Sequence, residues 1–96
     1  FWATWCTACI EELPLLRDLQ KKYMDKNVEF IAINAGERKK LIKKFLKRYD
    51  FPYKIVLDQG RKIAKKFKVE NLPQTFVISK EGKILFHGNR PPKTIK

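Results

Sequence analysis

The sequence predicts an α/β fold in which helices cover a mixed β-sheet. Segments with the apolar pattern of strands alternate with segments of helical periodicity, which is typical of this class. Near the C-terminus, residues 75–78 and 84–86 have strand patterns and flank a polar break with Gly82, which suits a tight hairpin. The 96 residues suffice for one domain, and 44 % hydrophobic residues suffice for a packed core.

The first third of the chain contains the end of a strand, a helix and a second strand. Residues 1–3 are apolar and precede Cys6, after which apolar residues recur at helical spacing. Pro14 offers no amide hydrogen to the carbonyl group of Ile10, so we expect this helix to kink. Residues 28–34 are apolar and rich in β-branched side chains, which predicts a buried strand. The predicted apolar stripe of the helix comprises Leu13, Leu15, Leu16, Leu19 and Tyr23.

The middle of the chain repeats the alternation of helix and strand. Residues 41–49 have helical periodicity, residues 53–57 have a strand pattern, and residues 60–67 form a short helical segment. Asp58 precedes that segment and is a suitable helix cap. The apolar side of the helix at residues 41–49 comprises Leu41, Ile42, Phe45, Leu46 and Tyr49.

Positive charge is concentrated in two helical segments. Lys and Arg number 22 against 10 Asp and Glu, for a net charge of +12, and they gather in residues 38–48 and 61–68. Their alternation with apolar residues favours two solvated helix faces, although nucleic acid or anionic membrane is an alternative partner. No apolar segment reaches the roughly 20 residues that a membrane-spanning helix requires.

The only two cysteines, Cys6 and Cys9, are separated by two residues at the start of the first predicted helix. This spacing puts both on one helix face, roughly 5 to 6 Å apart, within reach of a reversible disulfide. The alternatives are half of a zinc site, for which the one histidine, His87, is a distant further ligand, or two unreactive core thiols. The strand-to-helix context favours redox chemistry.

The position of Cys6 makes it the candidate nucleophile. Unpaired amides and the helix dipole favour negative charge at a helix N-terminus, so the Cys6 thiol should ionise more readily than a free thiol. A Cys6 thiolate would attack a substrate disulfide, and Cys9 would then resolve the mixed disulfide.

Together with the dithiol, the motifs at residues 1–14, 28–37, 56–58, 71–78 and 81–83 form one ordered set. This set resembles the thioredoxin-like TlpA/ResA family of extracytoplasmic thiol-disulfide oxidoreductases. Residues 1–9, with Glu12 and Pro14, are similar to the active-site segment of this family. Further similarity, in the same order and spacing, extends through residues 28–37, 56–58, 71–78 and 81–83. Ala8 stands where relatives usually have proline, so the reduction potential of the family does not carry over.

The resemblance implies a thioredoxin fold that uses no cofactor other than its redox-active disulfide. It also implies an extracytoplasmic location, with an N-terminal membrane anchor in the full-length protein. The implied partners are a disulfide-containing protein substrate, such as the haem-attachment cysteines of apocytochrome c, and an upstream membrane thiol reductant. Under this interpretation no nucleic acid is expected to bind, and membrane attachment is expected only through the N-terminal anchor.

The resemblance also assigns roles to individual residues. Glu12 matches an acidic residue near the dithiol that would tune the thiols or exchange a proton with Cys9; the alternative is a solvated glutamate in the first helical turn. Pro73 matches a cis-proline, and the backbone beside Leu72 would pair with an extended substrate; the alternative is an ordinary turn. Trp5 would line the substrate-facing rim. We expect Trp2 in the core, Glu11 on the surface and His87 in a structural or solvated position.

The resemblance further implies that residues 1–96 are a partial thioredoxin-like domain. The strand that leads into the dithiol is represented only by residues 1–3, and the closing helix after Arg90 is absent, so we expect truncation at both ends. Two other functions remain open from the sequence. One is a thioredoxin-like peroxide reductase, and the other is a basic module that binds nucleic acid or membrane.

Overall fold

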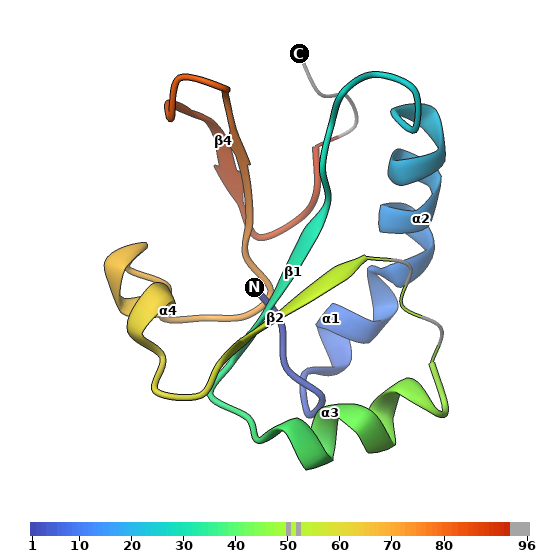
Figure 1. The fold of residues 1–96 in the computed structure, drawn as a ribbon, viewed down its shortest axis with the longest axis vertical. Helices are drawn as coiled ribbons and strands as arrows, with labels where there is room; N and C mark the ends of the chain where they lie inside the picture. The colour runs from blue at the N-terminus through green and yellow to red at the C-terminus, as the bar shows by residue number, and fades with distance from the viewer. Residues whose placement is uncertain (50, 52, 93–96) are drawn as a thin grey trace.

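The structure is a computed structural model that describes residues 1–49, 51 and 53–92. Helices flank two pairs of strands in this part of the chain (Figure 1). None of these helices is long and apolar enough to cross a membrane. In chain order the elements are α1 (Thr7–Glu11), α2 (Leu13–Lys22), β1 (Ile31–Ala35), α3 (Lys39–Leu46), β2 (Lys54–Asp58), α4 (Lys62–Lys66), β3 (Thr75–Ile78) and β4 (Ile84–Gly88).

The strands form one parallel and one antiparallel pair. β1 runs parallel to β2, with Ile31 opposite Lys54, and β3 runs antiparallel to β4, with Thr75 opposite Gly88. The predicted hairpin is confirmed, and Gly82 provides the positive φ, 88°, that its turn requires. The mixed α/β fold class is therefore confirmed, with the sheet in two parts.

The first two residues join these two parts. The Trp2 amide donates to the Ile33 carbonyl at 3.0 Å, and the Ala35 amide donates to the Trp2 carbonyl at 3.0 Å. On the other side, the Phe1 amino group donates to the Gln74 carbonyl at 2.7 Å, and the Gln74 amide donates to the Phe1 carbonyl at 3.3 Å. The N-terminus consequently lies between β1 and the start of β3 (Figure 1).

The first predicted helix is divided at Glu12. α1 ends one residue before Glu12, and α2 begins one residue after it. Pro14 falls in the first turn of α2, where its missing amide hydrogen leaves no carbonyl of that helix unpaired. The expected kink thus takes the form of a break, and the Glu12 amide still donates to the Ala8 carbonyl at 3.2 Å.

The ends of several other elements differ from prediction by up to three residues, and two of these differences have a clear cause. β1 begins at Ile31 rather than at residue 28, because its pairing with β2 starts there. α4 begins two residues later than predicted, because Arg61 adopts a left-handed conformation with φ 57°. The predicted cap is confirmed: the Asp58 carboxylate accepts hydrogen bonds from the Ile63 amide at 3.1 Å and the Ala64 amide at 2.9 Å.

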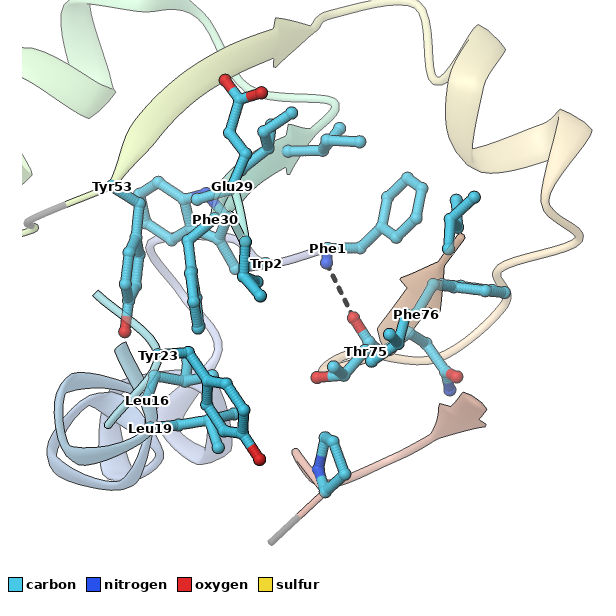
Figure 2. A pocket seen from close by; sticks show the side chains of 18 of the residues that line it. Phe1, Trp2, Leu16, Leu19, Tyr23, Glu29, Phe30, Tyr53, Thr75 and Phe76 are labelled. Carbon is cyan, nitrogen blue, oxygen red and sulfur yellow. Dashed lines mark hydrogen bonds between the residues drawn. The ribbon is translucent and has the colours of Figure 1, made fainter. Parts of the chain in front are cut away.

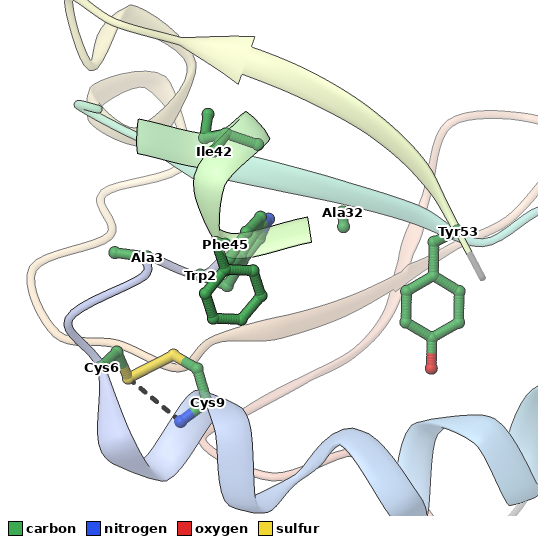
Figure 3. Packing of buried hydrophobic residues seen from close by; sticks show 8 residues of the cluster. All are labelled: Trp2, Ala3, Cys6, Cys9, Ala32, Ile42, Phe45 and Tyr53. Carbon is green, nitrogen blue, oxygen red and sulfur yellow. Dashed lines mark hydrogen bonds between the residues drawn. A yellow bond between two sulfur atoms is a disulfide. The ribbon is translucent and has the colours of Figure 1, made fainter. Parts of the chain in front are cut away.

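Two apolar clusters lie on opposite sides of β1. Ala32 belongs to the cluster that holds the dithiol, and Ala35 faces the cluster beneath α4, as side chains an odd number of residues apart on a strand must do. Figure 3 shows the first cluster, which comprises Trp2, Ala3, Cys6, Cys9, Ala32, Ile42, Phe45 and Tyr53. Trp2 is therefore a core residue, as predicted.

The apolar stripes of the helices are narrower than the periodicity predicted. Leu15 in α2 and Leu41 in α3 are 54 % and 50 % exposed, so their predicted place in the core was wrong. Each helix reaches the core through only two fully buried residues, Leu13 and Leu19 in α2 and Ile42 and Phe45 in α3. The basic residues of α3 are exposed, which confirms a solvated face.

Candidate active site

Cys6 and Cys9 form a disulfide at the beginning of α1. Their Cα atoms are 5.2 Å apart, within the predicted range. A turn leads into the cysteine pair. The Cys6 amide closes this turn by donating a hydrogen bond to the Ala3 carbonyl at 3.2 Å. Cys6 is the N-cap of α1, and its Sγ atom accepts a hydrogen bond from the Cys9 amide at 3.1 Å (Figure 3). The same amide would stabilise a Cys6 thiolate once the disulfide is open.

The two cysteines are buried beside an exposed tryptophan. Each cysteine is 5 % exposed, whereas Trp5, which directly precedes them, is 68 % exposed. An exposed indole ring is unusual in a core-forming segment and is well suited to contact with a partner. The predicted position of Trp5 at the surface is confirmed, and its role in substrate binding stays a prediction.

Glu12 is buried, so its interpretation as a solvated glutamate was wrong. It is 8 % exposed, and burial raises the pKa of its carboxyl group from 4.5 to about 7, against the opposing charges of the Phe1 ammonium and Arg90. Glu12 lies at the break between α1 and α2, three residues after the buried Cys9, while its neighbour Glu11 is exposed, as predicted. Glu12 and Cys9 line the same pocket.

That pocket is a large apolar space between β1 and β3. Its volume is about 1090 Å³, and Figure 2 shows Phe1 and Trp2 at its inner end with side chains of α2 on one wall. Burial lowers the pKa of the Phe1 amino group from 8.0 to about 6, and the nearby Glu12 carboxylate opposes this shift. An acid and a base with shifted pKa values therefore influence each other in the pocket that Cys9 also lines.

Leu72 and Pro73 reach the site from the far end of the chain. The Leu72–Pro73 peptide bond is cis, as the resemblance implies, and Pro73 is a buried residue of the pocket that Cys9 and Glu12 line. Leu72 packs against the cluster that contains both cysteines. The fold thus brings together every residue of the predicted site except Trp5, which points to solvent.

A second polar group beside the dithiol was not predicted as part of the site. Glu37 accepts hydrogen bonds from the Thr4 amide at 2.6 Å, from the Thr4 hydroxyl group and from Asn34 Nδ2 at 2.9 Å. The available signal was Asn34 within the buried strand and Glu37 just after it. Nothing in their spacing indicated that Thr4, 33 residues away, would be their partner.

The residues that the structure describes show no geometry that would support metal binding. No group of three or more His, Cys, Asp or Glu residues gathers among them, and the two cysteine sulfurs are bonded to each other. His87 is exposed, stacks on Phe76 with ring centroids 4.0 Å apart and contacts Gln74 through Nε2 at 2.7 Å.

Comparison of sequences finds close relatives among thiol-disulfide oxidoreductases. ResA of Bacillus cereus is 41 % identical over 85 residues, which cover 88 % of this chain and 49 % of that protein. ResA of Bacillus subtilis (strain 168) is 38 % identical over 85 residues, which cover 88 % of this chain and 48 % of that protein. The chain therefore spans about half the length of the curated relatives it matches.

Comparison of structures gives the same fold. A protein assigned as the thiol:disulfide interchange protein DsbE of Chlorobium tepidum matches with a TM-score of 0.84 and 28 % identity, covering 91 % of this chain and 62 % of that one. StoA of Bacillus subtilis matches with a TM-score of 0.82 and 23 % identity, covering 96 % of this chain and 71 % of that one. These structural matches confirm the thioredoxin-like fold. The sequence relatives confirm the resemblance to ResA. Because the sequence profile of the AhpC/TSA family matches residues 1–87, the chain belongs to that family.

Proposed function

We propose that this chain is a thiol-disulfide oxidoreductase that reduces protein disulfides through Cys6 and Cys9. The observation that carries the proposal is the geometry of Cys6, which caps α1 and accepts the Cys9 amide while bonded to the Cys9 sulfur. This arrangement lowers the cost of a thiolate at Cys6 and keeps a second thiol within reach. The names of the ResA relatives support the same activity.

The proposed reaction starts from the reduced dithiol. The Cys6 thiolate attacks one sulfur of the substrate disulfide, the substrate S–S bond breaks, and the released substrate thiolate takes a proton. Cys9 then loses its proton and attacks the Cys6 sulfur, which breaks the mixed disulfide and releases the second substrate thiol. The substrate gains two electrons and two protons, and the chain is left with the Cys6–Cys9 disulfide that the structure contains.

Glu12 is the proposed proton acceptor for Cys9. Its pKa of about 7 leaves a large ionised fraction near neutral pH, yet the carboxylate stays basic enough to take a thiol proton. Both residues line the same pocket, which supports this assignment.

The proposed substrate contacts are Trp5, Leu72 and Pro73. Trp5 offers an exposed apolar ring at the entrance to the dithiol, and the backbone at Leu72 would pair with an extended substrate segment. Pro73 has no amide hydrogen and occupies a buried position in the pocket beside Cys9, where it would keep a backbone donor away from the sulfurs.

The proposed setting is outside the cytoplasm, with attachment to the membrane through a segment other than the described helices. The resemblance to the TlpA/ResA family supports this setting, and it makes the haem-attachment cysteines of apocytochrome c the proposed substrate. Each turnover leaves an oxidised dithiol, so an upstream membrane thiol reductant must return two electrons and two protons.

Trapping the mixed disulfide tests the proposal. Cys9→Ser should accumulate substrate proteins covalently bound to Cys6, whereas the matched variant Cys6→Ser should capture none. Failure of Cys9→Ser to trap a partner, together with failure of the wild type to reduce a model protein disulfide, would overturn the proposal.

The same variants distinguish the other functions. Hydrogen peroxide turnover that survives the loss of one of the two cysteines, in Cys6→Ser or in Cys9→Ser, would indicate a peroxide reductase, because that chemistry uses one peroxidatic cysteine. Binding to nucleic acid or anionic vesicles that falls steeply with salt and survives loss of both cysteines would indicate a basic binding module.

A further inference from the structure

Glu37 is a buried carboxylate that links two segments distant in sequence. It is 8 % exposed and follows β1, where the Glu37 amide donates to Asn34 Oδ1 at 3.3 Å. Its Oε1 atom accepts from the Thr4 amide and from Asn34 Nδ2, and its Oε2 atom accepts from the Thr4 hydroxyl group. Burying a carboxylate is costly unless its oxygens are satisfied, and here three donors converge on them.

Thr4 belongs to the turn that delivers the dithiol. The turn runs from Ala3 to Cys6, and Thr4 and Trp5 occupy its two corners. Glu37 holds the first corner through both the amide and the hydroxyl group of Thr4. The second corner, Trp5, is 68 % exposed, whereas the first is held to the end of β1 by Glu37.

The other end of the linkage is rigid. Asn34 is completely buried, it pairs with Trp2 across a β-bridge, and it lies in β1 opposite Leu57 of β2. A turn fixed to such a strand loses little additional freedom when it binds a substrate, whereas a mobile turn would have to be ordered first. The contacts of Glu37 with Thr4 therefore affect the position of the dithiol as well as that of the loop after β1.

From these contacts we infer that Glu37 is a positioning residue for the dithiol. Its carboxylate fixes the Ala3–Cys6 turn so that Trp5 faces the substrate and the Cys6 sulfur keeps its hydrogen bond from the Cys9 amide. This inference rests on the proposed oxidoreductase function for its kinetic consequence. The effect of Glu37 on Cys6 itself is independent of any substrate.

Substitutions at the two partners separate position from charge. Glu37→Gln keeps an acceptor for the Thr4 amide and offers its Nε2 atom to the Thr4 oxygen, so it removes the charge but preserves the contacts. Glu37→Ala removes both the charge and the contacts with Thr4. Thr4→Val removes only the hydroxyl contact, and Thr4→Ser retains it.

Two measurements test the inference. The first is kcat/KM for a model protein disulfide, and the second is the pH dependence of Cys6 alkylation in the reduced protein. Glu37→Ala should lower kcat/KM about tenfold or more and move the alkylation profile to higher pH, because the displaced Cys6 loses its amide donor. Thr4→Val should show a smaller change in the same direction, whereas Glu37→Gln and Thr4→Ser should stay within about threefold of wild type. If charge were the cause, Glu37→Gln would shift the alkylation profile to lower pH.

Asp58→Ala is the matched control. Asp58 is also a buried carboxylate, 5 % exposed, that accepts two amides, but these belong to α4. Its loss should lower the melting temperature while leaving the alkylation profile and kcat/KM unchanged at temperatures well below melting.

Wild-type behaviour of both Glu37→Ala and Thr4→Val, or equal losses in Asp58→Ala, would overturn the inference. If the wild type reduces no disulfide, the proposed function fails, and the alkylation profiles still decide the role of Glu37. If Glu37→Ala does not fold, Thr4→Val against Thr4→Ser provides the decision.

Discussion

The carboxyl group of Glu12 and the amino group of Phe1 illustrate how burial sets the chemistry of single residues. Burial raises the pKa of Glu12 to about 7 and lowers the pKa of the Phe1 amino group to about 6. Each charge partly offsets the penalty of the other. A carboxyl group that titrates near neutral pH can exchange a proton with a thiol, whereas an ordinary surface glutamate is too weak a base.

Replacement of Glu12 by glutamine tests this proton exchange. In the wild type, the step in which Cys9 resolves the mixed disulfide should accelerate as pH rises through about 7, because Glu12 becomes ionised. Glu12→Gln should abolish that dependence and slow the step about 100-fold at neutral pH. Stopped-flow measurement of mixed-disulfide decay checks both effects. The exposed neighbour Glu11 provides the control. If Glu11→Gln showed the same altered pH profile as Glu12→Gln, a specific role for Glu12 would be contradicted.

For single residues, the sequence could predict those contacts that follow from local spacing along a helix. Cys6, Cys9 and Glu12 are three residues apart in turn, so helical geometry places them near one another before any fold is known. The contact of Thr4 with Glu37 depends on where β1 ends relative to the N-terminal turn, which no local pattern contains.

Among the secondary-structure elements, the interruption between α1 and α2 has the clearest local cause. Pro14 cannot continue the hydrogen bonding of α1, and it occupies the first turn of α2, where it is well tolerated. The positions of the other elements followed from periodicity and turn residues. Their ends depended on strand pairing and on the left-handed Arg61, which are tertiary and conformational effects that periodicity does not report.

Pro14→Ala should therefore change stability little. Because the proline lies in a first turn, its removal should alter the free energy of unfolding by less than about 1 kcal/mol. The matched substitution Asp18→Pro, at an exposed position inside α2, should cost about 3 kcal/mol or more. Urea unfolding of both variants measures these differences. A gain in Pro14→Ala as large as the loss in Asp18→Pro would show that position 14 behaves as an interior helical position and that the proline is not tolerated there.

Across the whole molecule, the two strand pairs depend on Phe1 and Trp2 for their backbone connection. The pocket between β1 and β3 is lined by residues of both strands, and the apolar side chains around it are shown in Figure 2. Local patterns predicted each strand but not this separation, since a pattern shows that a strand is buried without showing what covers its edges. The family resemblance did imply the separation, because only residues 1–3 represent the strand that leads into the dithiol. A segment that entered in line with Phe1 would run parallel to β1 and antiparallel to β3, because the bonds of Phe1 and Trp2 already have those directions.

When the polypeptide begins at Phe1, the two buried charges give its stability a distinctive pH dependence. The amino group has a lower pKa folded than its ordinary 8.0, so it destabilises the fold fully below about pH 6 and stops doing so as pH rises through 8. Glu12 has a higher pKa folded than its ordinary 4.5, so its penalty appears as pH rises from 4.5 to about 7. The two slopes oppose each other between pH 6 and 7. In Glu12→Gln only the first should remain, and the melting temperature should rise steadily between pH 6 and 8.

An added strand should stabilise the molecule in two separable ways. We expect that fusing about six alternating β-branched residues to Phe1 pairs the edges of β1 and β3 and removes the buried ammonium. A control fusion of equal length, with proline at alternate positions, removes the ammonium but cannot pair. At about pH 5 both fusions should raise the melting temperature by several degrees, because the ammonium penalty is on the order of 2 kcal/mol there. At about pH 9 only the strand-forming fusion should still do so. Equal melting temperatures of the two fusions at both pH values would show that the space between β1 and β3 does not accept a strand.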